Sequence, residues 1–407
     1  MTVKSLRLRN FRNYSLQFIE FSDGANIICG NNAQGKTNIL EAVFLCSTGR
    51  SHRTQKDSEL IKFGEDSTKI EVEIDRKNYG SFRIEIEIQR SGGKSVVING
   101  VPQRRAGDLL GMLNSVIFSP EDLAIIKGEP QIRRRFLDMF ISQIKPAYYF
   151  NLHNYLSALR QRNILLRQAR ENRRLLDTVV AWDSQLANYG SKVIWERQYF
   201  IRLISGYAKK NHATITGGAE NLSVTYNASL KTGGSGGAPD ISGETPATED
   251  GVSVRNGGLG DSFEDTDADD KRRAEKTIGD AFINALENGL ETDLMRMSTQ
   301  YGPHKDDISF SIGGKNIRLY GSQGQQRTAA ISLKMAQVDA MALETGDIPV
   351  LLLDDVMSEL DSVRQGNISQ NMKNAQLFLT GTDINRPLDA DAGFFRVENG
   401  RISLTPA

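Results

Sequence analysis

The chain has 407 residues, of which 39% are hydrophobic, so it can bury a large core and is long enough for two or three lobes. It contains no run of about 18 apolar residues and opens on an alternating, charged segment, which argues against a membrane-spanning helix or an apolar targeting segment. Its two cysteines, Cys29 and Cys46, form no CxxC pair and its four histidines are scattered, so neither a disulfide framework nor a zinc site is indicated. We expect a soluble, cytoplasmic protein.

The formal net charge is zero, but the charges are unevenly distributed along the chain. Residues 231–270 hold ten acids and two bases; 50 less 2 bases and 50 less 10 acids leave a net charge of +8 elsewhere. That balance is compatible with a surface that binds phosphate groups. The same segment is rich in Gly, Ser and Thr and poor in large apolar groups, which predicts a disordered loop.

The N-terminal third has the patterns of strands around one loop and one helix. Residues 3–10 alternate, and the apolar run 26–29 enters an Asn/Gly loop that is followed by helical spacing from 38 to 45. Residues 68–76 and 81–90 alternate strictly on either side of a KNYG turn, which is typical of an antiparallel sheet with one wet face.

The rest of the chain is first helical and then mixed. Helical spacing extends from about 131 to 211 and returns from 272 to 297. Further on, the patterns predict strands at ISFSI (308–312) and NIRL (316–319), a helix at 322–343, a buried strand at 350–353, and a core strand and edge hairpin in QLFLTGT and FFRVENGRISL.

These elements suggest one α/β lobe that is split between the two ends of the chain. We divide the sequence into an N-terminal half of the lobe (1–125), a helical insertion lobe (126–300) that contains the acidic loop, and a C-terminal half (301–407).

One segment carries a phosphate-binding motif. Residues 30–37 read GNNAQGKT, which fits GxxxxGK[ST] and stands after a short apolar strand and before a helix, as that motif requires. Backbone amides can wrap phosphate oxygens there, Lys36 can reach the β- and γ-phosphates, and Thr37 can ligate magnesium. The predicted ATP contacts are Gly30, Asn31, Asn32, Ala33, Gln34, Gly35, Lys36, Thr37 and Asn38.

The apolar strand at 350–353 ends in two carboxylates. Asp354 suits a magnesium ligand together with Thr37, and Asp355 suits the acid that polarises the attacking water. Alone, such a pair would more often cap the next element, but with the phosphate-binding loop we predict Lys36 and Asp355 as catalytic residues. The short side chain of Asp355 should hold the attacking water less favourably than a longer glutamate would, which predicts slow hydrolysis.

Two further stretches define the class. Residues 321–325 (GSQGQ) resemble the signature motif LSGGQ of ABC ATPases, and residues 358–361 (SELD) resemble the D-loop of those proteins. The resemblance implies that Ser322, Gln323, Gly324, Gln325 and Asp361 contact ATP. It also implies that the signature of one subunit faces the nucleotide of another, so a chain with one copy of each motif should form an ATP-dependent homodimer.

Within the ABC ATPases, the opening LRNFRNY (8–14) is similar to that of the SMC and RecF group, whose Phe-Arg lies near the nucleotide and implicates Arg12. FSPED (118–122), RRRFLD (133–138), QRN (161–163) and GPHKDD (302–307) resemble the RecF family of bacterial recombination mediators. The expected fold is α/β: an ABC-type P-loop ATPase head with an antiparallel β subdomain and a helical insertion lobe.

The resemblance implies a DNA replication and repair protein of the SOS response to DNA damage, active at the nucleoid. It would bind double-stranded and gapped DNA, clamp it as an ATP- and Mg²⁺-dependent dimer, help load RecA with RecR and RecO, and hydrolyse ATP weakly in a DNA-stimulated reaction. An ATP-gated DNA scaffold with little or no turnover remains the alternative. Candidate DNA contacts are Arg104, Arg105, Arg133, Arg134 and Arg135, although such charge at a helix start is also typical of a solvated face.

Overall fold

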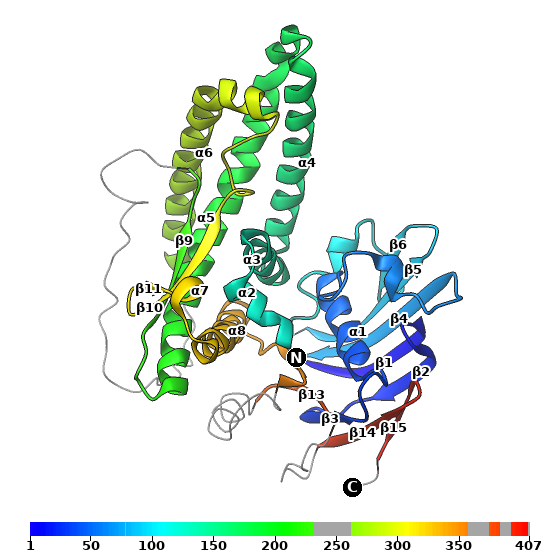
Figure 1. The fold of residues 1–407 in the computed structure, drawn as a ribbon. Helices are drawn as coiled ribbons and strands as arrows, with labels where there is room; N and C mark the ends of the chain where they lie inside the picture. The colour runs from blue at the N-terminus through cyan, green and yellow to red at the C-terminus, as the bar shows by residue number, and fades with distance from the viewer. Residues whose placement is uncertain (78, 231–261, 357–373, 383–391, 406–407) are drawn as a thin grey trace. The chain divides into compact units, whose positions relative to one another are not determined.

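The structure is a computed structural model that describes residues 1–77, 79–230, 262–356, 374–382 and 392–405, with backbone only at 262–267. Contacts divide the chain into two compact units. The first unit, here called the head, contains Met1–Tyr149, Phe200–Thr225 and Ile308–Ala407, and the second, the helical unit, contains Phe150–Tyr199 and Tyr226–Asp307. Figure 1 shows the elements of both.

A six-stranded sheet at the centre of the head joins the two ends of the sequence. Its order is β15-β14-β3-β13-β12-β8, and every pairing is parallel except that of the edge strand β15 with β14. The strands are β3 (Ala25–Cys29), β8 (Ser115–Phe118), β12 (Val350–Asp354), β13 (Leu377–Gly381), β14 (Gly393–Glu398) and β15 (Arg401–Leu404). Because parallel strands end at the same edge, the loops after β3 and β12 are brought together there.

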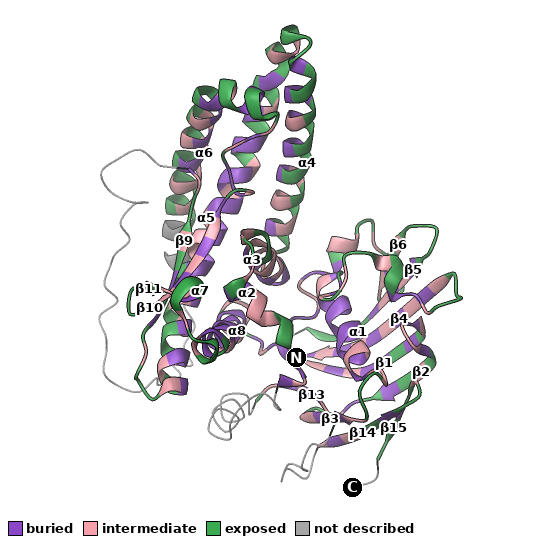
Figure 2. Ribbon diagram, viewed as in Figure 1, coloured by how far each residue is buried: buried purple, intermediate pink, exposed green. Residues whose placement is uncertain are grey.

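A second sheet in the head is antiparallel, as the alternating segments predict. Its order is β2-β1-β4-β5-β6-β7. The strands are β1 (Thr2–Phe11), β2 (Tyr14–Glu20), β4 (Ser67–Arg76), β5 (Gly80–Gln89), β6 (Lys94–Ile98) and β7 (Val101–Pro102). Its apolar face and the central sheet share one core with helix α1 (Lys36–Thr48), visible as purple segments in Figure 2. This burial fixes the start of α1 between the two sheets.

The other head elements are short helices, one long helix and a small sheet. The α-helices are α2 (Leu123–Lys127), α3 (Pro130–Ile144), α7 (Ile317–Tyr320) and α8 (Gln323–Thr345). The 3₁₀ turns are η1 (Asp57–Leu60), η2 (Ala106–Leu109) and η3 (Pro120–Asp122). A three-stranded sheet has the order β11-β10-β9, with β11 at Lys315–Asn316, β10 at Asp307–Ile312 and β9 at Leu222–Asn227.

The prediction of a strand at NIRL was wrong. Asn316 ends the two-residue β11 and its side chain accepts a hydrogen bond from Arg318 N, which caps one turn of helix from Ile317 to Tyr320. A four-residue segment with two apolar positions fits either period, and the local cap decides between them.

The helical unit is built from long helices. They are α4 (Pro146–Ala169), α5 (Val179–Thr216) and α6 (Ser262–Arg296), with the turn η4 (Arg173–Thr178) between the first two. The start of α4, up to Tyr149, and the part of α5 from Phe200 onward belong to the head. The compact unit begins at Phe150, later than the predicted boundary at 126, because α3 packs with α1 and α8 in the head. No helix in the described part of the chain is long and apolar enough to cross a membrane.

Candidate nucleotide-binding site

The predicted phosphate-binding loop connects β3 to α1, as the motif requires. Lys36 is 5% exposed, and its ammonium donates to Gly30 O over 2.7 Å and to Asn31 O over 3.1 Å. The charge therefore lies inside the curve of the loop. Gly35 caps α1 with a φ angle of 113°, a backbone conformation that favours glycine.

The loop is held from the antiparallel sheet. Asn13 donates to Gln34 O over 2.7 Å, and Tyr14 donates through its hydroxyl to Gly35 O over 3.1 Å. A Cβ atom added to Gly35 would lie 2.5 Å from the side chain of Asn13. Asn13 and Tyr14 were not predicted as site residues, although both belong to the LRNFRNY stretch.

The loop is also held from the C-terminal hairpin. Asn399, between β14 and β15, donates its backbone N–H to Gln34 Oε1 over 2.6 Å. A Cβ atom on Gly30 would lie 2.4 Å from Val397 O. Nothing in the local sequence indicates these contacts, because they join residues more than 360 positions apart.

The predicted acidic edge lies against the loop. Asp354 Oδ1 accepts hydrogen bonds of 2.8 Å from Thr37 Oγ1 and from Thr380 Oγ1. Burial raises the pKa of Asp354, the hydroxyl groups of Thr380 and Thr37 oppose this rise, and the charge of Asp355 adds to it. A hydroxyl and a carboxylate are hard oxygen ligands, so this pair fits the preference of Mg²⁺.

Asp355 has an unusual backbone conformation, with a φ angle of 54°. Its N–H donates to Thr380 Oγ1 over 3.0 Å, so Thr380 joins both acids. Sequence reasoning missed Thr380, which stands in the LFLTGT strand and carries no motif of its own. The strained conformation turns the chain sharply after β12.

Arg12 was predicted to contact ATP, and the structure places it in an ion pair with Glu41 of α1. Its guanidinium donates to the two carboxylate oxygens over 2.6 and 2.9 Å and to Glu59 O over 2.9 Å. Glu41 has no exposed surface, whereas the side chain of Arg12 is 20% exposed. The buried Glu41 thus holds the partly exposed side chain of Arg12 in place, and the sequence did not indicate this partner.

The signature segment begins α8, and Ser322, Gln323 and Gly324 are exposed. Ser322 and Gln325 form a capping box: Ser322 Oγ accepts from Gln325 N over 3.2 Å, and Gln325 Oε1 accepts from Ser322 N over 2.9 Å. The helix N-terminus therefore faces solvent with positive potential, as an anion site requires. Asp361 of the predicted D-loop lies outside the described residues.

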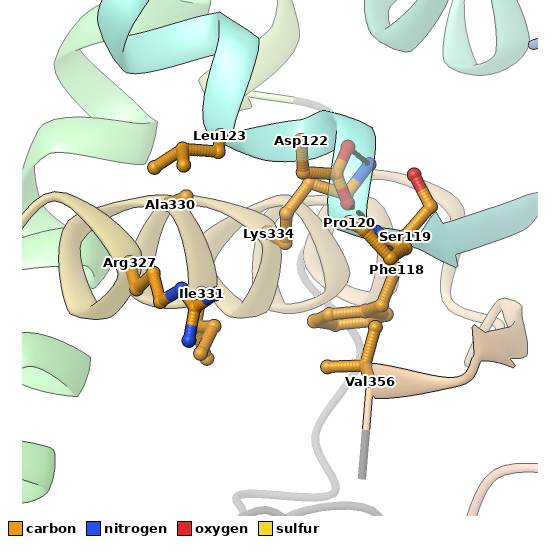
Figure 3. A pocket seen from close by; sticks show the side chains of 10 residues that line it. All are labelled: Phe118, Ser119, Pro120, Asp122, Leu123, Arg327, Ala330, Ile331, Lys334 and Val356. Atoms are coloured by element: carbon orange, nitrogen blue, oxygen red, sulfur yellow. Dashed lines mark hydrogen bonds and ion pairs between the residues drawn. The ribbon is translucent and has the colours of Figure 1, made fainter. Parts of the chain in front are cut away.

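A pocket lies between α8, the loop after β8 and the residue after Asp355. Its lining includes Phe118, Asp122, Lys334 and Val356, and Figure 3 shows the Lys334 ammonium directed at the Asp122 carboxylate, 3.6 Å away. Burial lowers the pKa of Lys334 and raises that of Asp122, while the attraction between the two opposes both shifts. This pair ties the signature helix to the end of β8.

The candidate DNA contacts differ in exposure. Arg104 and Arg105 are exposed, and Arg134 is partly buried. Arg133 is 3% exposed and donates to Gly128 O over 2.7 Å, so its position argues against a phosphate contact. Arg135 donates to Ser51 O over 3.0 Å. A run of arginines at a helix start thus serves partly to hold loops.

Comparison with known proteins identifies the class and the fold of the chain. Residues 2–392 match the RecF/RecN/SMC N-terminal domain family, which defines the chain as a P-loop protein of that class. The SMC head domain of Pyrococcus furiosus shares the fold, with a TM-score of 0.50 at 15% identity over 99% of this chain and 95% of that one. The predicted α/β ABC-type fold, with its antiparallel sheet and helical regions, is confirmed.

Within the class, the chain belongs to the RecF family. It is 40% identical to the DNA replication and repair protein RecF of Ruminiclostridium cellulolyticum over 99% of both chains, and 39% identical to that of Acetivibrio thermocellus over 98% and 99%. A solved structure described as the recombination mediator RecF with ATP in the RecFOR pathway has a TM-score of 0.84 and 34% identity over 99% of this chain and 97% of that one.

Proposed function

We propose that this chain is an ATP-dependent DNA-binding protein of DNA replication and recombinational repair. Two copies would close on ATP, clamp double-stranded DNA at single-strand gaps, and help load RecA together with RecR and RecO. Slow ATP hydrolysis would reset the dimer. The family to which the chain belongs and the RecF structure with ATP support this proposal.

One observation supports ATP as the ligand more than any other. Thr37 at the start of α1 and Asp354 at the end of β12 meet within 2.8 Å, beside a loop whose curve holds the Lys36 ammonium. These three groups have the chemistry of a magnesium-ligand pair and a phosphate partner, and they lie at the edge where parallel strands end. Lys36 and Thr37 are neighbours in one motif, and folding brings Asp354 of the other motif, 317 positions from Thr37, against them.

In this proposal each side chain has one task. Lys36 leaves the loop carbonyls to neutralise phosphate charge, Thr37 and Asp354 hold Mg²⁺, and Asp355 orients a water molecule. Ser322 and Gly324 present the N-terminus of α8 to the nucleotide of the other copy. ATP with Mg²⁺ would bind between the two copies. Because this complete site exists only in the dimer, ATP binding would shift the monomer–dimer equilibrium toward the dimer.

Sedimentation of the purified protein with and without ATP and Mg²⁺ tests this proposal. We expect ATP to convert monomer to dimer and to raise affinity for a short duplex, and Lys36→Ala to do neither. A wild-type protein that stays monomeric and binds DNA equally without ATP would contradict the clamp.

The alternative is an ATP-gated scaffold in which turnover hardly matters. The short side chain of Asp355 favours this version, because an aspartate reaches less far toward an attacking water molecule than the glutamate that most ABC ATPases carry there. Asp355→Asn keeps the shape and tolerates the left-handed backbone at this position. If Asp355→Asn binds DNA with ATP like wild type while Lys36→Ala does not, binding without turnover is sufficient for the DNA step.

A further inference from the structure

The chain leaves α5 through a turn that returns an acidic side chain to the helix. Gly217 and Gly218 have φ angles of 62° and 80°, and Gly218 N donates to Ala213 O over 2.8 Å, a hydrogen bond of the kind that closes a helix end. Glu220, which follows this turn and precedes β9, thereby lies against the last turns of α5. Its Oε2 is 3.0 Å from His212 Nε2.

His212 is fully buried and connects α5 to α8. Its Nδ1 lies 3.1 Å from Ser332 Oγ, and the Ser332 hydroxyl donates to Thr328 O over 2.7 Å. Because a carbonyl oxygen only accepts, Ser332 Oγ is left to accept from His212 Nδ1–H. Each ring nitrogen then faces an acceptor, so His212 and Glu220 share a proton that makes their contact charge-assisted.

The other carboxylate oxygen of Glu220 reaches the signature segment. Glu220 Oε1 accepts from Gln325 Nε2 over 2.9 Å, while Gln325 Oε1 accepts from Ser322 N over 2.9 Å. The side-chain amide of Gln325 is therefore held at both ends, by the cap on one side and by Glu220 on the other. A chain of polar contacts thus runs from the buried His212 to the exposed N-terminus of α8.

We propose that Glu220 and His212 are positioning residues for the signature motif. Acting through Gln325, they fix the first turn of α8 in the conformation that receives a nucleotide held by a second copy of the chain. Donors that are already oriented need no reorganisation when a charged ligand arrives, and the dimer avoids the cost of ordering them. The identity of that ligand rests on the proposed function.

The experiment compares Glu220→Ala with a matched control, Asp339→Ala. Asp339 also joins α5 to α8, since it accepts from Asn211 Nδ2 over 2.8 Å, but it lies far along α8 from the signature. Backbone amide exchange, measured without nucleotide, should become at least tenfold faster at 321–328 in Glu220→Ala and stay unchanged there in Asp339→Ala. Peptides from the phosphate-binding loop should exchange as in wild type in both variants.

A second readout follows the two binding steps separately. In Glu220→Ala, ATP affinity of the monomer should stay within twofold of wild type, whereas ATP-dependent dimerisation should weaken tenfold or more, because each dimer contains two signatures. If Glu220 acts through Gln325, the double variant Glu220→Ala/Gln325→Ala should dimerise no more weakly than Gln325→Ala alone. Glu220→Gln, which keeps the volume but not the charge, supplies the same comparison if Glu220→Ala is too unstable.

Equal exchange at 321–328 in Glu220→Ala and wild type would overturn the inference, as would additive effects in the double variant. The proposed function fails in a different way. If wild type does not dimerise with ATP but exchange at 321–328 responds as expected, the positioning role stands and the ATP clamp falls.

Discussion

Glu41 in α1 is fully buried, and its carboxylate accepts hydrogen bonds from two other segments. Arg12 donates to both carboxylate oxygens and Ser51 donates over 2.5 Å. Burial alone would raise the pKa of Glu41, but the hydrogen bonds from Arg12 and Ser51 outweigh it, so the pKa lies below its ordinary value. The ionised form of Glu41 therefore stabilises the head.

Glu41→Gln should lower the free energy of unfolding by about 3 kcal/mol at pH 7, because it leaves a largely buried guanidinium without its counter-charge. A carboxylate with a lowered folded pKa contributes stability above its unfolded pKa and loses it as the pH falls. The difference between wild type and variant should thus shrink below about pH 4.5. Urea unfolding at pH 7 and in acid measures both effects.

The exposed pair between Glu73 and Arg83 supplies the control for that prediction. The two side chains are 46% and 55% exposed, so Glu73→Gln should cost well under about 1 kcal/mol. Similar costs for Glu41→Gln and Glu73→Gln, or a cost for Glu41→Gln that is independent of pH, would contradict the role given to Glu41.

Thr380 links the two acids of the site, and its hydroxyl can be removed at nearly constant volume. Thr380→Val should reduce ATP hydrolysis roughly tenfold, about 1.4 kcal/mol in the barrier, because Asp354 and Asp355 N lose a shared partner. ATP binding should change little, since the phosphate-binding loop is untouched. Phosphate release and nucleotide titration check this, with Thr380→Ser as control; equal rates for Val and Ser would reject it.

At the scale of single residues, those that belong to a sequence motif could be predicted, whereas those that act through tertiary contacts could not. That Thr37 and Asp354 lie together could be predicted, because two motifs in the sequence, the phosphate-binding loop and the apolar strand that ends in acids, indicate it. Asn399 and Glu41 could not, because what they do depends on partners that only the fold brings near. Arg133 shows the converse: its charge predicts a DNA contact, which stays a prediction, whereas its burial and its hydrogen bond to Gly128 O could not be predicted from the sequence.

Two neighbouring segments confine the phosphate-binding loop. A side chain added at each of its two glycines would contact a different one of them. Gly30→Ala would meet the backbone of β14, which cannot move cheaply, whereas Gly35→Ala would meet the side chain of Asn13. Gly64 also has a positive φ angle, 87°, but open space around it. We expect costs of about 3 kcal/mol for Gly30→Ala and about 1 kcal/mol for Gly64→Ala, with Gly35→Ala between them.

Thermal and urea unfolding measure this order, and a cost for Gly30→Ala no larger than that of Gly64→Ala would show that β14 does not confine the loop. Nucleotide binding adds a second check. Gly64→Ala should bind ATP like wild type, whereas displacement of Asn13 in Gly35→Ala should weaken binding.

Element patterns were most informative where they were long. Strict alternation over ten residues predicted β4 and β5 nearly to their ends, and α8 began one residue after its predicted start. Short segments gave no such signal: β2 was not predicted, and three of the four residues of α7, 317–319, were predicted to belong to a strand. In both cases contacts or a cap outside the segment determine its conformation.

At the scale of the molecule, two of the stretches that resemble the RecF family, QRN and GPHKDD, belong to the helical unit and not to the head, and they make buried polar contacts there. Arg162 of QRN is fully buried between Asp183 and Asp293, at 2.5 and 2.6 Å. Asp306 of GPHKDD accepts from the hydroxyl of Tyr226. These buried polar contacts join segments more than twenty residues apart in the chain. Helical spacing predicted the helices. The boundary of the unit could not be predicted in this way, because it depends on the packing of α3 in the core of the head.

The charge balance of the whole chain gives the last prediction. Replacing the acids of 240–261 with amides raises the formal net charge from 0 to +5; they are Asp240, Glu244, Glu249, Asp250 and Asp261. If the proposed DNA binding is limited by the neutral total charge, duplex affinity should rise severalfold at low salt. The gain should vanish as salt shortens the range of the field to below about 10 Å.

A control distinguishes total charge from local masking. Amides at Glu171, Asp177, Asp280, Glu287 and Glu291, exposed acids of the helical unit, change the net charge equally. Equal gains in both variants would mean that the field of the whole molecule attracts DNA, whereas a gain confined to 240–261 would mean that this segment screens the binding face. An affinity unchanged in both at low salt would contradict the prediction, because phosphate contacts would then be insensitive to the removal of five negative charges.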